Sequence, residues 1–280
     1  MITIYGSVGY TILNGNTSFN GLKFKVIIYA DKHDNNIGCN NNFDMAGWMK
    51  TKFTSSNIIL EEVPRNKDSK LEELWPTSYH TQNLKNLYLD NSNIIKGSDI
   101  RTYLIPYSWE LDRSEEHHSV DLFEYVKSID EFFALKNEYC IKTLPVYKNL
   151  QHTLKGKHFM ILKKNFDDFL TKYQLLLFEI TDSIKKNQSY VLEELNELLD
   201  SIMEWYTIAN IDENRNNVIH VGLAHSEKIV KWLTTHYSYT IEMEHGINYL
   251  EKLTHNVSGC VKLSHDIDTQ FGGTFGFTSL

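Results

Sequence analysis

Two histidines follow two apolar stretches of the chain in the same way. After Lys25, residues 26–30 form an apolar run that breaks at Asp31, with His33 two positions later. Residues 218–221 form a second, largely apolar run, which enters a tight turn and is followed by His225. Short apolar runs between polar residues predict buried strands of a parallel sheet. Ligands of open α/β sheets bind at the carboxyl ends of such strands, where Asp31, His33 and His225 are expected.

Two glutamates, Glu61 and Glu62, follow a third apolar run at residues 58–60. Successive side chains of a strand point to opposite faces, so only one of the two carboxylates can point into a site. With His33 and His225, such a carboxylate supports two chemistries. Either the histidines bind a divalent metal ion that activates water, or one histidine is a general base oriented by the carboxylate. A third interpretation is that these side chains only bind loop ends or solvent.

Asp99 and Arg101 are two positions apart in the β-prone segment 97–104. Residues at that spacing on a strand share a face. Arg101 then either forms a bidentate ion pair with Asp99, which is the slightly favoured alternative, or binds a substrate anion. In the second case Arg101 and Asp31 are the predicted substrate-binding residues.

The elements that position these residues are predicted from periodicity. Apolar residues recur at helical spacing over residues 43–53, between the strands at 25–31 and 58–60, which predicts a β-α-β unit. Helical spacing recurs through residues 119–206, and its Leu and Phe stripes are expected to form core. After this region, the pattern predicts a strand at residues 218–221, a helix at residues 226–236 and a further strand at residues 238–242.

These elements predict an α/β fold with a central mixed or parallel sheet, flanking helices and a helical insertion. Short β-prone pieces at residues 2–5 and 10–13 predict a hairpin at the edge of the sheet. We assign residues 1–257 to one domain, with the insertion at about 119–206. Residues 258–280, rich in glycine and aromatic residues, form a C-terminal tail.

Composition excludes several classes of protein. The chain has 280 residues, of which 41% are hydrophobic, so it can bury a sizeable core. Its net charge is −8 without a long basic run, which argues against nucleic-acid binding. No apolar segment reaches the roughly 20 residues of a membrane helix, so no membrane partner is expected. Three widely spaced cysteines and the lack of a signal peptide predict reduced thiols and a cytoplasmic location.

Four short motifs in this order resemble a known superfamily, which groups erythromycin esterase, the ChaN haem-binding lipoprotein and the Tiki/TraB proteins. Its members carry two G-x-x-H motifs, each after a strand, and a glutamate after the second strand. Residues 30–33 match the first motif, residues 222–225 the second, and Glu61 or Glu62 the glutamate. Residues 99–101 look like the later D-x-R motif. The chain also resembles uncharacterised proteins of large DNA viruses, which pair D-x-H with a later D-I-R.

The resemblance implies a hydrolase that cleaves an ester or amide bond of a small-molecule or peptide substrate. His33, His225 and Glu61 or Glu62 would activate water, with or without a divalent metal ion held by the two histidines. Ala30 departs from the family by replacing the first motif's glycine. That departure and the tail favour the alternative, a non-catalytic binding or structural protein. Such a protein would act as a homo-oligomer, a virion component or a host-interaction component in the host cytoplasm.

Overall fold

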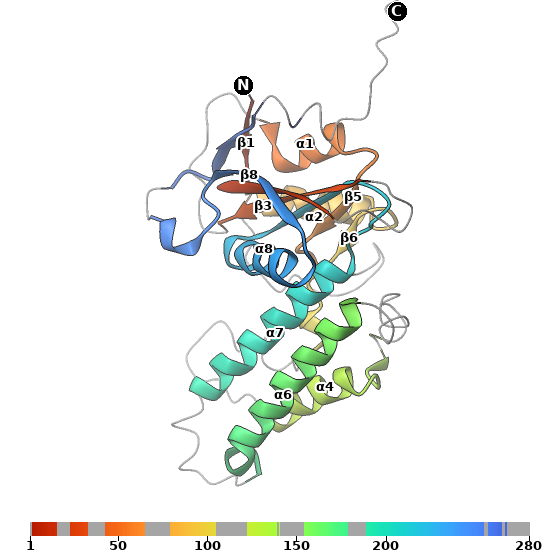
Figure 1. Cartoon of the computed structure of the whole chain (residues 1–280), viewed down its shortest axis with the longest axis vertical. Coiled ribbons are helices and arrows are strands. Elements are labelled where there is room, and N and C mark those ends of the chain that lie inside the picture. The colour runs from red at the N-terminus through yellow and green to blue at the C-terminus, as the bar shows by residue number, and fades with distance from the viewer. Residues whose placement is uncertain are drawn as a thin grey trace, which may run out of the picture. The chain divides into compact units, whose positions relative to one another are not determined.

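The chain divides into two compact units (Figure 1). The computed structural model describes residues 2–15, 23–32, 43–64, 79–104, 122–138, 140, 154–178, 189–254, 257–264 and 267. One unit, which we call the sheet unit, consists of Met1–Ser98 and Asn210–Leu280. The other, the helical unit, is Asp99–Ala209 and contains the insertion predicted at about residues 119–206.

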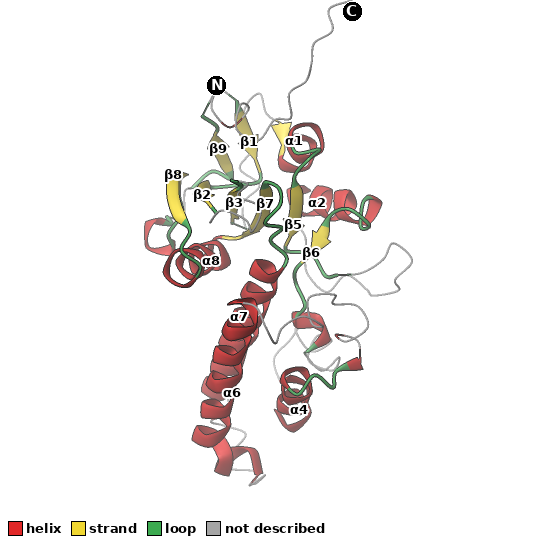
Figure 2. Cartoon of the chain, turned by 45° about the vertical axis from the view of Figure 1, so that its right-hand side comes forward, coloured by secondary structure: helices red, strands yellow, loops and turns green. Residues whose placement is uncertain are grey.

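A mixed six-stranded sheet organises the sheet unit, in the order β6-β5-β7-β3-β2-β8 (Figure 2). The pairs β6–β5, β5–β7 and β7–β3 are parallel, whereas β2 is antiparallel to both β3 and β8. The predicted α/β fold is therefore confirmed, with a mixed sheet. The strands are β2 (Gly9–Asn14), β3 (Lys25–Asp31), β5 (Asn57–Leu60), β6 (Lys96–Gly97), β7 (Asn217–Gly222) and β8 (Thr240–Gly246).

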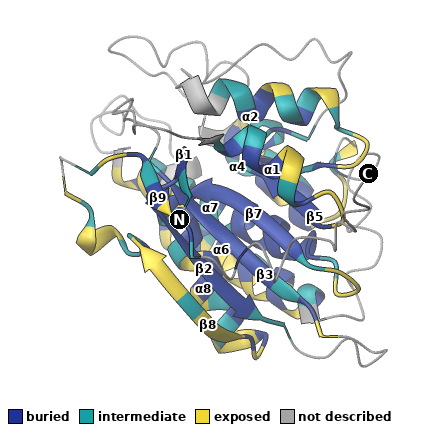
Figure 3. Cartoon of the chain, turned by 90° about the horizontal axis from the view of Figure 1, so that it is seen from above, coloured by how far each residue is buried: buried dark blue, intermediate teal, exposed yellow. Residues whose placement is uncertain are grey.

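Helices cover both faces of this sheet. Tyr29 of β3 belongs to the apolar cluster of α1 (Met45–Lys52) and α2 (Tyr79–Asp90), and its hydroxyl accepts a hydrogen bond from Trp48 Nε1 (3.2 Å). The next residue, Ala30, packs against the first residue of α8 (Leu223–His236). Because successive side chains of a strand point to opposite faces, α8 lies on the other side from α1 and α2. Burial on both faces explains the continuous apolar runs of β3 and β7 (Figure 3).

The predicted hairpin of the first two β-prone pieces is wrong. β1 (Thr3–Tyr5) does not pair with β2 but lies in a separate three-stranded sheet, parallel to β4 (Phe43–Asp44) and antiparallel to β9 (Cys260–Lys262). Gly6 takes a positive φ of 102° between the two strands. This conformation suits glycine and directs the chain from one sheet into the other.

Cysteine chemistry also differs from the prediction. Cys260, at the start of β9, is disulfide-bonded, so the expectation of three reduced thiols is wrong for this residue. β9 itself lies in the segment predicted as a tail; residues 268–280 of that segment lie outside the described residues. Cys140 is a free, buried thiol, and burial raises its pKa to about 12. Such a thiol stays protonated near neutrality and is a poor nucleophile.

The helical unit has an aromatic core of its own. It is built from a short 3₁₀ helix, η1 (Arg101–Tyr103), and from α4 (Leu122–Phe133), α6 (Leu154–Phe178) and α7 (Ser189–Ala209). Phe132, Phe166 and Trp205 are fully buried in one cluster, which confirms that the Leu and Phe stripes form core. In the described part of the chain, no helix combines the length and apolar character needed to cross a bilayer.

Candidate functional site

Three neighbouring strands bring polar residues to one edge of the six-stranded sheet. Asp31 ends β3, Gly222 ends β7 opposite it, and Glu61 directly follows β5. All three strands run parallel, so their carboxyl ends share this edge, as the sequence predicts. His225 lies in the first turn of α8, which starts immediately after β7.

Glu61 is the glutamate that the structure brings to His225. Its backbone N–H donates to the carbonyl of His220 (3.0 Å) and so continues the pairing of β5 with β7. Its carboxylate Oε2 accepts a hydrogen bond from the N–H of Gly222 (2.7 Å). Gly222 is the N-cap of α8 and has no side chain to cap the helix. The Glu61 carboxylate therefore supplies negative charge at the positive end of the α8 dipole.

His225 and Glu61 face each other in a largely enclosed place. Glu61 Oε1 lies 3.6 Å from His225 Nε2, and each side chain is only 11% exposed. This distance suits an ion pair when the imidazole is protonated and is longer than a direct hydrogen bond. A carboxylate beside a nearly buried imidazole is an arrangement that general acid–base chemistry uses.

The remaining predicted residues of this edge have different environments. Asp31 is 2% exposed and lies in register with Gly222. Glu62 follows Glu61, and its carbonyl lies so close to Gly97 that a Cβ there would be 2.5 Å from the oxygen. His33 lies outside the described residues, in the segment 33–42. Its predicted role as catalytic residue and metal ligand stays a prediction.

Ala30, the departure from the family motif, causes no backbone strain. Its carbonyl accepts hydrogen bonds from Val8 N (2.8 Å) and Ser7 Oγ (2.9 Å). Among the described non-glycine residues, positive φ values occur at Leu135 and Ser238, not at Ala30. This strand end does not need glycine's conformational freedom, because Ala30 keeps an ordinary conformation.

Arg101 belongs to the helical unit, where its guanidinium group binds two carboxylates. Its Nε and Nη2 bind the two oxygens of Asp99 at 2.8 and 3.0 Å, and Nη1 binds Asp200 at 2.7 Å. The residues lie at and before η1, so the predicted strand is wrong although the pairing of Arg101 with Asp99 is confirmed. This bidentate geometry supports the structural alternative over substrate binding.

The described residues do not make a metal site by themselves. Among them, no group of three or more His, Cys, Asp and Glu side chains could hold an ion. His225 and Glu61 are two possible donors, but Glu61 Oε2 already accepts the Gly222 N–H.

Sequence reasoning missed a buried histidine that forms a hydrogen bond in this part of the sheet unit. His220 of β7 is 5% exposed, and its Nε2 donates to the carbonyl of Gly6 (2.8 Å). That bond fixes the turn that separates β1 from β2. The available signal was the polar His220 inside the otherwise apolar run 218–221.

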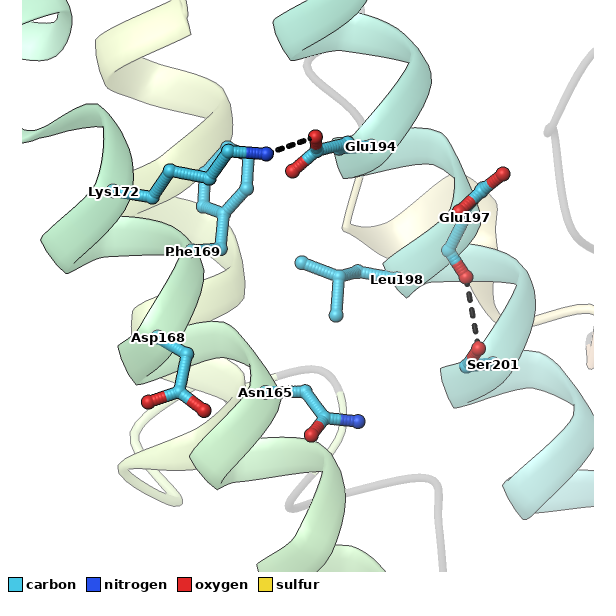
Figure 4. A pocket seen from close by; sticks show the side chains of 8 residues that line it. All are labelled: Asn165, Asp168, Phe169, Lys172, Glu194, Glu197, Leu198 and Ser201. Atoms are coloured by element: carbon cyan, nitrogen blue, oxygen red, sulfur yellow. Dashed lines mark hydrogen bonds and ion pairs between the residues drawn. The ribbon is translucent and has the colours of Figure 1, made fainter.

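A groove of about 470 Å³ lies between α6 and α7 of the helical unit (Figure 4). Its charged side chains are mostly exposed, and Lys172 donates to Glu194 across it. This hydrogen bond raises the pKa of Lys172. Ser201 donates to the backbone carbonyl of Glu197 (2.9 Å). The described side chains that line the groove include no enclosed acid–base pair. Glu61 and His225 therefore remain the candidate site.

Comparisons with known proteins add no relative. A scan against family models, a search of curated proteins and a search of solved structures each found no match to this chain. The superfamily resemblance therefore stays a prediction that rests on its four short motifs.

Proposed function

We propose that the protein is a hydrolase in which Glu61 and His225 activate water to cleave an ester or amide bond. The observation that carries this proposal is the 3.6 Å approach of Glu61 Oε1 to His225 Nε2 at the carboxyl ends of parallel strands. The two residues come from different motifs, 164 positions apart in the sequence (225 − 61). The resemblance to the erythromycin esterase and Tiki/TraB superfamily points to the same pair.

One water molecule can hydrogen-bond to both side chains. At about 2.8 Å from each atom, it spans the 3.6 Å between Oε1 and Nε2. His225 Nε2 takes a proton from this water, whose oxygen forms a bond to the carbonyl carbon of the substrate. The Glu61 carboxylate stabilises the imidazolium that results. When the tetrahedral intermediate collapses, the bond to the leaving alcohol or amine breaks and His225 returns the proton to it.

In this mechanism, the first turn of α8 supplies backbone hydrogen-bond donors to the oxyanion. The helix has no side-chain cap, and Gly222 N–H is held by Glu61. The following backbone N–H groups of a first turn have no partner within the helix. Because α8 starts directly after β7, we infer that these N–H groups stabilise the oxyanion that develops during attack.

The alternative is a non-catalytic binding or structural protein, and one observation favours it. The Glu61 carboxylate accepts the N–H of Gly222, the first residue before α8, and this structural role needs no substrate. The disulfide of Cys260 removes the reduced cysteines as an argument for the predicted cytoplasmic location. Homo-oligomer formation and viral assembly stay predictions of this second interpretation.

A panel of chromogenic esters and amides tests the hydrolase proposal. We expect turnover by the wild-type chain and a loss of about 10²–10⁴-fold in His225→Gln, as for removal of a general base. Glu61→Gln keeps an oxygen for Gly222 and should lose activity through its charge. His236→Gln, at the far end of α8, is the matched control and should keep full activity.

Thermal melts establish that each variant is folded. Turnover that survives in folded His225→Gln, or no hydrolysis by the wild type above the uncatalysed rate across the panel, would contradict the proposal. Loss of stability in Glu61→Gln without any measurable activity in the wild type supports the structural alternative.

A further inference from the structure

Strand β8 forms one edge of the six-stranded sheet and pairs with β2 on its inner side. In the described ranges of the chain, no strand pairs with its outer side. Six of its seven residues are exposed and Met243 is half-buried (Figure 3). A strand of this length with an open edge presents unpaired backbone donors and acceptors to any extended chain.

Acidic side chains disfavour pairing of this edge with β8 of a second copy of the chain. β8 carries Glu242 and Glu244 two positions apart, and its register with β2 shifts beside them, between Ile12 and Leu13. Antiparallel pairing of two β8 strands around Met243 would place Glu242 of one copy opposite Glu244 of the other. Like charges directly opposite on a sheet are destabilising.

More carboxylates gather at one end of β8 around Tyr249. The Tyr249 hydroxyl donates to Glu244 Oε1 (2.6 Å), and Glu227 of α8 accepts from Leu250 N (3.0 Å). The bond to Glu244 and partial burial, with the nearby charges of Glu227 and Glu251, raise the pKa of Tyr249 to about 12. Three elements therefore contribute negative charge to the same place.

Two lysines contact this acidic group. Lys25 binds Glu242 at 2.6 Å, and Lys252 lies over the Tyr249 ring at 4.6 Å from its centroid. The remaining acidic charge still exceeds the basic charge. Ile241 pairs with Leu13 and is 44% exposed; it lies on the same face of β8 as Glu244, which pairs with Thr11, because the register shift skips Glu242.

We propose that β8 is a docking edge for an extended, basic segment of a partner protein. Backbone hydrogen bonds to the open edge provide the common part of the affinity, as in other cases of strand addition. Basic side chains of the added strand pair with Glu242 and Glu244.

A fluorescent peptide of alternating lysine and valine tests the proposal by anisotropy with the full chain. We expect saturable binding that weakens at least about tenfold in the double variant Glu242→Lys with Glu244→Lys, since 1.4 kcal/mol is tenfold. The matched control is Glu193→Lys with Glu197→Lys on α7, which changes net charge equally at exposed positions. Its affinity should stay close to that of the wild type.

A second peptide separates strand addition from simple charge attraction. It has the same sequence but a methyl group on every backbone nitrogen, so it lacks the N–H groups that a ladder needs, and it should not bind. Hydrogen exchange of the wild-type chain gives a readout that needs no variant. The lysine–valine peptide should slow exchange in residues 240–246.

Several results would overturn the proposal. They are no binding of the lysine–valine peptide, equal binding of the N-methylated peptide, or equal weakening by both double variants. A wild-type dimer in sedimentation that the β8 variant abolishes would assign the edge to a second copy instead.

Discussion

At the scale of single residues, Glu61 shows what alternation along a strand decides. The sequence offers two adjacent glutamates, and the structure directs Glu61 to Gly222 and His225. The choice could not be made from the sequence, because it depends on the register of β5 against β7. That Asp31, Glu61 and His225 follow the three central strands could be predicted, since each motif is local.

Arg101 gives a prediction about buried and exposed ion pairs. Arg101→Met leaves the Asp99 carboxylate, whose side chain is 7% exposed, without its main partner. Breaking a buried pair in this way costs up to about 3–5 kcal/mol of the free energy of unfolding. Urea unfolding of the full chain measures the loss.

Arg215→Met is the matched control for Arg101. Its pair with Asp212 has the same 2.8 Å distance, but the Arg215 side chain is 45% exposed. Its removal should cost less than about 1 kcal/mol. Equal losses for the two variants would show that burial does not set the strength of the Arg101 pair.

At the scale of elements, the strands buried on both faces could be predicted and the edges could not. β3 and β7 are continuous apolar runs because helices cover both sides of them. β1 has the same local character as β2, but its partners β4 and β9 lie far along the chain. Periodicity contains no information on such distant pairing, and the same holds for the disulfide of Cys260.

The Cys260 disulfide yields a prediction for the three-stranded sheet. Cys260→Ser should lower the free energy of unfolding by about 2–4 kcal/mol, the typical contribution of a disulfide. Reduction of the wild type should have a similar effect, and it should not destabilise the variant further. Thermal melts with and without a reductant measure both.

Alkylation in denaturant supplies an independent check of the same bond. The peptide that contains Cys260 should react only after reduction, whereas the Cys140 peptide should react in either case. Alkylation of Cys260 without reductant would contradict the structure.

At the scale of the whole molecule, the two units have separate cores. Among the described residues, the cluster around Phe166 draws only on residues 100–209, and the cluster around Phe53 draws only on the sheet unit. Phe166→Ala should cost about 3–5 kcal/mol through the cavity it leaves. We expect hydrogen exchange to accelerate in α4, α6 and α7 and to stay unchanged in β3 and β7.

Phe53→Ala should give the reverse pattern, because Phe53 is equally buried in the other core. Acceleration spread evenly over both units in either variant would show that they unfold as one cooperative body.

The place of β7 in the sheet has a consequence for synthesis of the chain. β7 lies between β3 and β5, yet residues 61–216 must be translated after β5 before it emerges. At about 5–20 residues per second, this takes on the order of ten seconds. During that interval the nascent chain holds two half-sheets, each with an apolar strand lacking its neighbour. His225 follows closely after β7 in the sequence. The central strand and the second residue of the proposed acid–base pair are therefore synthesised at almost the same time.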